Sequence, residues 1–213
     1  MTDARLRDAE RRWRETGALA DEAAWLRERV RAGALDDERL RLAAYVGHAA
    51  ARLALATPVL SSPYVQAWIY GLQPWGVEPA QRAAVAAARR ALVHVPSDTR
   101  RGRYARGALA RVERAVVGLP PLPPLPWDPH VLDDDPPARE RAAFDAACAA
   151  GETVHEVARA APDARALEAT ARAGGVVIRA VEATDEATIR AAVRDELSAW
   201  ALGAGDPVLA RAL

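Results

Sequence analysis

The chain has 213 residues, 51% of them hydrophobic, and its 29 basic and 29 acidic side chains give a formal net charge of zero. A chain of this length can bury a core without disulfides or metals. The balanced charge provides no overall field that would draw the protein to nucleic acid or to an anionic membrane, although a local charged patch is compatible with it. All 29 basic residues are arginine, which is typical of GC-rich coding sequences.

Cysteine content and the N-terminal sequence bear on the cellular compartment. Cys148 is the only cysteine, so neither an intrachain disulfide nor a cysteine metal cage can form. The N-terminal residues are charged from Asp3 onward and do not resemble a signal peptide, and no apolar run is long enough to span a membrane. We therefore expect a cytoplasmic protein, and no sequence motif indicates a cofactor or a metal.

Alanine makes up much of the hydrophobic fraction, and it favours helices and disfavours strands. The clearest helix start lies at Asp36 or Asp37, where a carboxylate can accept a hydrogen bond from the first turn. Most of the following residues are apolar, which predicts a buried helix. Gly47 then predicts a tight corner and a second helix over residues 49–56, with an unbroken helix through Gly47 as the alternative.

Caps, glycines and prolines predict the remaining helices. The expected helices span residues 3–15, 21–32, 63–72, 79–95, 97–118, 138–150, 152–161, 163–173 and 185–202. The branched residues of 175–183 (GVVIRAVEA) are compatible with helix or strand, and the helical context favours helix. The sequence thus predicts an all-α protein, with antiparallel helix pairs forming a bundle or a short HEAT-like solenoid.

Prolines recur every few residues between positions 119 and 138 (LPPLPPLPWDPHVLDDDPPA). This spacing excludes helix over most of the segment and predicts an extended, polyproline-like strap whose leucines and Trp127 could lie against the helices. The segment divides the chain into an N-terminal helical region, residues 1–118, and a C-terminal helical region, residues 139–213. The two regions could nevertheless share one core.

Catalytic motifs are scarce in this sequence. No glycine-rich phosphate loop or serine elbow is present, and Cys148 lies among alanines, as a small buried residue would. The best grouping of metal-binding residues is His130 with Asp133, Asp134 and Asp135, but its spacing matches no known ligand motif. A metal-dependent helical enzyme using His130 and Asp133–Asp135 is therefore an alternative interpretation, and we do not expect the protein to be an enzyme.

One helix has an uneven distribution of charge. Within residues 97–118, five arginines precede Glu113 with no acid between them, and at helical spacing they lie around one face. These arginines are Arg100, Arg101, Arg103, Arg106 and Arg111. They could pair with acids from other helices, bind an acidic protein partner, or bind nucleic acid. The neutral overall charge makes nucleic acid the least favoured of the three.

Three blocks carry a resemblance to known proteins. AWIYGLQPWGVEPAQRAAVAAARRAL, at 67–92, and AAVRDELSAWALGAGDPV, at 191–208, are similar to helical immunity proteins of GC-rich bacteria. DEAAWLRERVRAGALDDERLRLAAYVGHAAARLAL, at 21–55, resembles a helical module of myxobacterial proteins. The resemblance implies a protein that binds and neutralises a toxin, and it implies no catalytic residues. We accordingly expect a non-enzymatic protein-binding protein, of immunity or adaptor type, whose partner is a toxin or a subunit of a complex.

Overall fold

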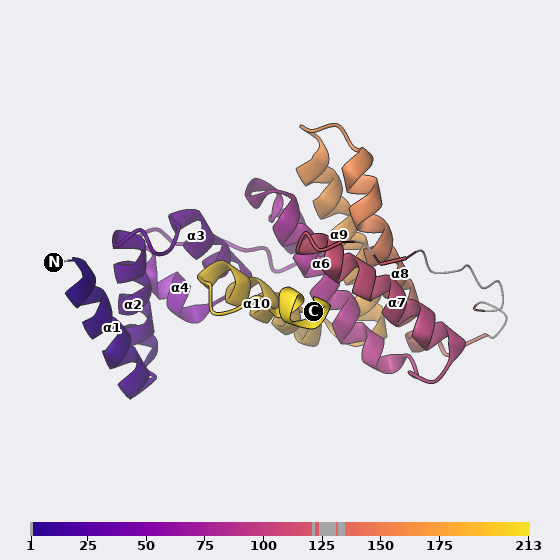
Figure 1. Cartoon of the computed structure of the whole chain (residues 1–213), viewed down its shortest axis with the longest axis horizontal. Coiled ribbons are helices and arrows are strands. Elements are labelled where there is room, and N and C mark those ends of the chain that lie inside the picture. Colours follow the sequence, from indigo (N-terminus) through magenta and orange to yellow (C-terminus); the bar gives the residue numbers. More distant parts are fainter. Residues whose placement is uncertain (1, 121, 124–130, 132–134) are drawn as a thin grey trace. The chain divides into compact units, whose positions relative to one another are not determined.

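The alanine-rich sequence folds mainly as helix in the part of the chain that the structure describes. A computed structural model describes residues 2–120, 122, 123, 131 and 135–213, and over these it contains eleven α-helices and no strand (Figure 1). The expected all-α class is confirmed. The chain divides into two units, a first formed by Met1–Ser61 with Leu197–Gly205 and a second formed by Ser62–Glu196 with Asp206–Leu213.

The helices follow one another with short connections over most of the chain. Their bounds are α1 (Thr2–Thr16), α2 (Leu19–Arg31), α3 (Asp37–Val46), α4 (Ala49–Ala54), α5 (Val65–Tyr70), α6 (Val77–Ala91), α7 (Arg100–Val116), α8 (Ala138–Arg159), α9 (Arg165–Ala183), α10 (Glu186–Leu202) and α11 (Pro207–Ala212). Two short 3₁₀ helices, η1 (Gln73–Trp75) and η2 (Leu92–His94), flank α6.

In the first unit, α2 packs against α1 and α4, and α3 packs against α4 (Figure 1). The Asp36 side chain caps α3 by accepting a hydrogen bond from the Glu38 N–H at 3.0 Å, as the sequence predicts. Six of the ten residues of α3 are buried, which confirms the expected buried helix. Gly47 ends α3 with a φ of 107°, and α4 follows at once, so the expected corner is also confirmed.

Helix α1 is fixed to α2 by stacked tryptophan rings. The Trp13 and Trp25 ring centroids lie 4.3 Å apart with an interplanar angle of 13°, and the Arg29 guanidinium lies 4.8 Å from the Trp25 ring centroid. Such ring contacts add to the burial of apolar area. Helix α2 begins two residues before Asp21, which lies in its first turn instead of capping it.

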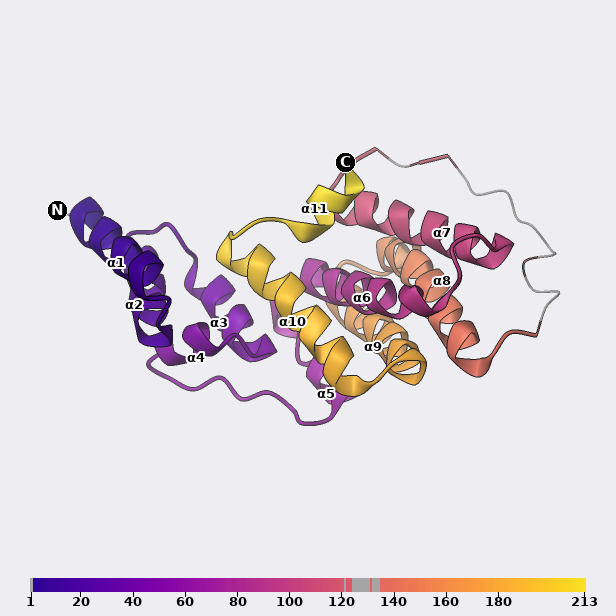
Figure 2. The ribbon, with the colours of Figure 1, turned by 90° about the horizontal axis from the view of Figure 1, so that it is seen from below.

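In the second unit, α6 is the most buried helix. It packs against α7, α8 and α9 (Figure 2). Its buried alanines are Ala80, Ala83, Ala84, Ala86, Ala87, Ala88 and Ala91. Because alanine side chains are short, three neighbouring helices can approach α6 closely. Helices α6 and α7 precede the proline-rich segment and α8 and α9 follow it, so helices from both sides pack together within the second unit.

Helices α8 and α9 are longer than the sequence indicates. We expected breaks at Gly151 and at Gly174-Gly175, but each helix continues through its glycines, and residues 175–183 are helical. A glycine inside a helix costs only about 1 kcal/mol relative to alanine. The extensive packing of α8 and α9 against each other and against α6 outweighs that cost.

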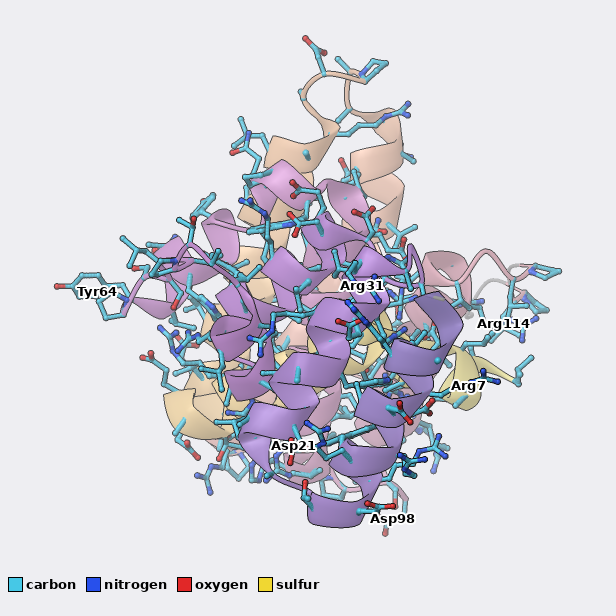
Figure 3. All side chains as sticks on the ribbon, turned by 90° about the vertical axis from the view of Figure 1, so that its left-hand side faces the viewer. Arg7, Asp21, Arg31, Tyr64, Asp98 and Arg114 are labelled. Atoms are coloured by element: carbon cyan, nitrogen blue, oxygen red, sulfur yellow. The ribbon has the colours of Figure 1, made fainter. Side chains whose placement is uncertain are left out.

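One helix start and one short helix depart from expectation. The cap of α7 is Thr99, whose hydroxyl accepts a hydrogen bond from the Gly102 N–H at 2.9 Å, two residues after the expected start at Ser97. Helix α11 was not expected, although an aspartate followed by proline, Asp206-Pro207, is a helix-start signal. Before α5, the Tyr64 side chain projects away from the ribbon and is 76% exposed (Figure 3).

Most of the proline-rich segment lies outside the described residues. Its roles as an extended strap and as a domain boundary therefore stay predictions, as does a solenoid arrangement of the helices. In the part of the chain that the structure describes, no helix is both long and apolar enough to cross a membrane.

Candidate functional site

Arg101, one of the five predicted binding arginines, is an internal residue. It is only 7% exposed, and its Nη1 atom donates to Glu140 Oε1 on α8 at 3.4 Å. The guanidinium also lies 5.7 Å from the Phe144 ring centroid. Arg101 thus pairs with an acid from another helix and holds α7 against α8. This is the first of the three roles that the sequence allowed for the five arginines.

Arg103 and Arg106 have no carboxylate partner among the described residues. Arg103 donates to the backbone carbonyl of Asp98, and Arg106 donates to the carbonyls of Val95, at 2.9 Å, and Gly102, at 3.1 Å. A carbonyl oxygen positions a guanidinium group but does not neutralise its charge. Both side chains therefore keep a full positive charge in a fixed place.

The two remaining arginines of the predicted set differ in exposure. Arg100 is exposed in the first turn of α7. Arg111 is partly buried, and its Nη2 atom is buried without a hydrogen-bond partner in the described structure. Because Nη2 lies inside the protein, a partner cannot reach it without a local movement.

Two further arginines extend the charged region beyond α7. The pKa of His94 is lowered by its partial burial and by the charges of Arg139, on α8, and Arg90, on α6. His94 precedes Val95, whose carbonyl binds Arg106. Three helices thus bring positive charge to the connection between α6 and α7.

We call Arg90, Arg100, Arg103, Arg106 and Arg139 the arginine surface. All but Arg106 are exposed, and Arg106 is partly exposed. The sequence pattern on α7 identified three of these residues. Arg90 and Arg139 were missed because they lie on other helices and share no sequence spacing with α7.

A second cluster of charges is buried in the second unit and centres on Arg82. This residue, on α6, is 1% exposed and forms a bidentate pair with Asp206, with Nη–Oδ distances of 2.8 and 2.7 Å. Its Nε atom donates to Glu78 Oε1 at 3.0 Å, and Nη1 lies 3.5 Å from Glu196 Oε1 on α10. Arg82 thus ties α6 to α10 and to the residue that caps α11.

The same network continues through Arg211 on α11. Arg211 donates to Glu196 Oε2 and to Glu113 Oε1, each at 2.9 Å, and Glu113 also pairs with Arg89 of α6. Glu113 is 1% exposed. Since each member has an oppositely charged partner, the network is fully paired, and its role is to join α6, α7, α10 and α11.

The alternative metal site lies largely beyond the described part of the chain. His130, Asp133 and Asp134 are outside the described residues. Asp135 is described, and its exposed carboxylate pairs with Arg141. The described residues contain no group of three or more histidine, cysteine, aspartate or glutamate side chains positioned to hold a metal ion. The metal-dependent alternative therefore stays a prediction.

Cys148 has the environment of an unreactive thiol. Burial, followed by the charges of Asp145 and Glu152, raises the pKa of Cys148 to about 12. Because the thiolate is the nucleophilic form, a thiol with this pKa stays protonated and inert near neutral pH. The structure thus agrees with the interpretation of Cys148 as a small packing residue.

Comparison with known proteins gave no relative of this chain. No protein-family model matches it, and neither does any curated protein or solved structure. The arginine surface and the buried network are therefore interpreted from their own contacts, burial and charge.

Proposed function

We propose that this is a non-enzymatic protein-binding protein, of immunity or adaptor type, that contacts its partner through the arginine surface. The partner is a protein with an acidic surface, such as a toxin or a subunit of a complex. The observation that carries the proposal is the fixed, uncompensated charge of Arg103 and Arg106, whose guanidinium groups bind backbone carbonyls and no described carboxylate.

Fixed arginines are favourable for binding because ordering a flexible side chain at an interface costs entropy. Arg103 and Arg106 are already held by hydrogen bonds from within the protein. Their remaining N–H donors could bind carboxylates of a partner in the paired geometry that guanidinium groups favour. Side chains that are held in place before binding lose less entropy on binding, which supports the proposal.

The extent of the surface favours a protein partner over a polyanion. The five arginines of the arginine surface gather at the start of α7 and the adjoining ends of α6 and α8, while the whole chain has no net charge. A small positively charged patch is complementary to an acidic patch of similar size on a partner protein. Such complementarity makes binding specific and speeds association. Nucleic-acid binding instead draws on a basic footprint that follows the phosphate backbone.

The test is a charge reversal on the arginine surface. The tagged wild-type protein is expected to retain one stoichiometric protein partner from an extract of its native host, identified by mass spectrometry. The double variant Arg100→Glu/Arg103→Glu should retain at least about tenfold less of that partner, because each substitution replaces an attractive charge by a repulsive one.

A matched control is available on α9. Arg165 and Arg179 are exposed, belong to the same unit, and donate to backbone carbonyls as Arg103 does. The variant Arg165→Glu/Arg179→Glu should retain the partner as the wild type does. Equal retention by both double variants would reject the arginine surface as the binding site, and loss of the bound material on nuclease treatment would indicate nucleic acid instead.

A further inference from the structure

The first unit contains a pocket of about 330 Å³ beside α4. Its lining consists of Arg52, Leu55, Ala56, Pro58, Val59, Leu60 and Ser61. This volume lies at the lower end of the range found for ligand sites, and it suits one or two amino-acid residues. All of its lining residues belong to the first unit, whereas the arginine surface belongs to the second.

Arg52 gives the pocket a fixed positive charge. Its Nε atom donates to the Ala44 carbonyl at 2.9 Å, and its Nη2 atom donates to Ser61 Oγ at 3.2 Å. Both acceptors are neutral, and no ion pair of Arg52 is found among the described residues. A guanidinium group has five N–H donors, so these two bonds leave three for a ligand.

The pocket is also lined by apolar side chains, among them Leu55 and Leu60, and by backbone without backbone hydrogen bonds. Leu60, in the connection between α4 and α5, is 88% exposed, so its side chain is accessible to a ligand. Residues 56–61 make no backbone–backbone hydrogen bond in the described structure, so the N–H groups of Val59 and Leu60 can bind an additional chain. An apolar wall, a held guanidinium group and free backbone donors thus lie together.

We propose that this pocket binds the C-terminal end of a peptide chain whose last residue is apolar. In such a residue the carboxylate and the apolar side chain are attached to the same Cα atom, so the first can bind Arg52 while the second lies against Leu55 and Leu60. Capture of a terminal carboxylate by charged and backbone donors is an established mode of peptide recognition. This site is independent of the arginine surface, and neither proposal needs the other.

The experiment compares two labelled hexapeptides, both Gly-Ser-Gly-Ser-Val-Leu, one with a free carboxylate and one with a C-terminal amide. Fluorescence anisotropy with the full-length protein should show the acid form binding at least about tenfold more tightly than the amide, because the amide lacks the charge-assisted hydrogen bonds. Amide NMR signals of residues 55–61 should shift only with the acid form.

Three variants locate the site. Arg52→Gln and Leu60→Ser should each raise the dissociation constant of the acid form by about fivefold to tenfold. Because Leu60 is 88% exposed, its replacement should leave folding unchanged. Arg41→Gln, which alters an exposed arginine of the same unit paired with Asp37, should bind like the wild type. Equal affinity for acid and amide, no saturable binding at millimolar peptide, or wild-type affinity in Leu60→Ser would each overturn the proposal.

Discussion

Arg82→Met is expected to lower the free energy of unfolding by about 3–5 kcal/mol, the range observed when one partner of a buried ion pair is removed. Methionine retains most of the length of the arginine side chain and leaves little empty space. The loss of stability therefore measures the missing charge more than a cavity. Without the guanidinium group, Asp206 loses its bidentate partner, and Glu196, which is 5% exposed, keeps only Arg211. Urea unfolding followed by circular dichroism measures the change.

The size of this effect should depend on pH. Hydrogen bonds from Arg82 lower the pKa of Asp206 below its ordinary value. A lowered pKa contributes stability that is fully present above about pH 4, the unfolded-state pKa, and is lost as the pH falls through the folded-state pKa. The difference between wild type and Arg82→Met should therefore be largest near neutral pH and shrink in acid.

A surface ion pair provides the control for Arg82. Arg41 pairs with Asp37 at 2.7 Å, with both side chains about half exposed. Arg41→Met should unfold at nearly the same urea concentration as the wild type, since exposed pairs contribute little to stability. If Arg82→Met also stayed within about 1 kcal/mol of the wild type at neutral pH, the buried network would not be what joins α6, α10 and α11.

Gly102→Ala is expected to destabilise the protein by about 2–3 kcal/mol through overpacking. A Cβ atom at position 102 would lie 1.8 Å from the carbonyl oxygen of Pro96 and 2.9 Å from its carbonyl carbon. Both are backbone atoms, so the connection before α7 would have to move. That connection also carries the Val95 carbonyl that binds Arg106, so the same substitution should disturb the arginine surface. Thermal and urea unfolding measure the loss.

Gly151→Ala is the matched control, and it should raise the free energy of unfolding where Gly102→Ala lowers it. Position 151 is also a helical glycine, but an added Cβ atom would make ordinary contacts of 3.8 and 3.9 Å with Ala108 and Val112. Alanine is the better helix former, so we expect the free energy of unfolding to rise by about 0.5–1 kcal/mol. If Gly102→Ala were also neutral or stabilising, the close approach of Pro96 to α7 would be wrong.

Local chemistry in the sequence predicts where many of these helices start and end. Asp36 caps α3, Gly47 turns the chain, and the Asp185 carboxylate accepts a hydrogen bond from the Thr188 N–H at 2.8 Å at the start of α10. The errors arise where packing overrides local preference. Gly151 and Gly174 signal helix ends, but α8 and α9 continue because long-range contacts outweigh a small local cost.

The charged side chains were harder to predict. Spacing on α7 identified Arg103 and Arg106, but it could not distinguish them from Arg101, which Glu140 neutralises across a helix interface. The partners in the buried network are separated by up to 124 positions, as Arg82 and Asp206 are. Helical periodicity relates residues only within one helix, so pairs of this kind become visible only in the folded structure.

The most direct test of the proposed function is the salt dependence of partner binding. Isothermal titration of the purified partner into the wild-type protein should give a dissociation constant that rises with salt concentration, because ion pairs at an exposed surface are screened. For Arg100→Glu/Arg103→Glu the dissociation constant should be at least about tenfold higher at low salt, and the difference should narrow as salt is added. A dissociation constant that is insensitive to salt and equal in the two proteins would contradict binding through the arginine surface.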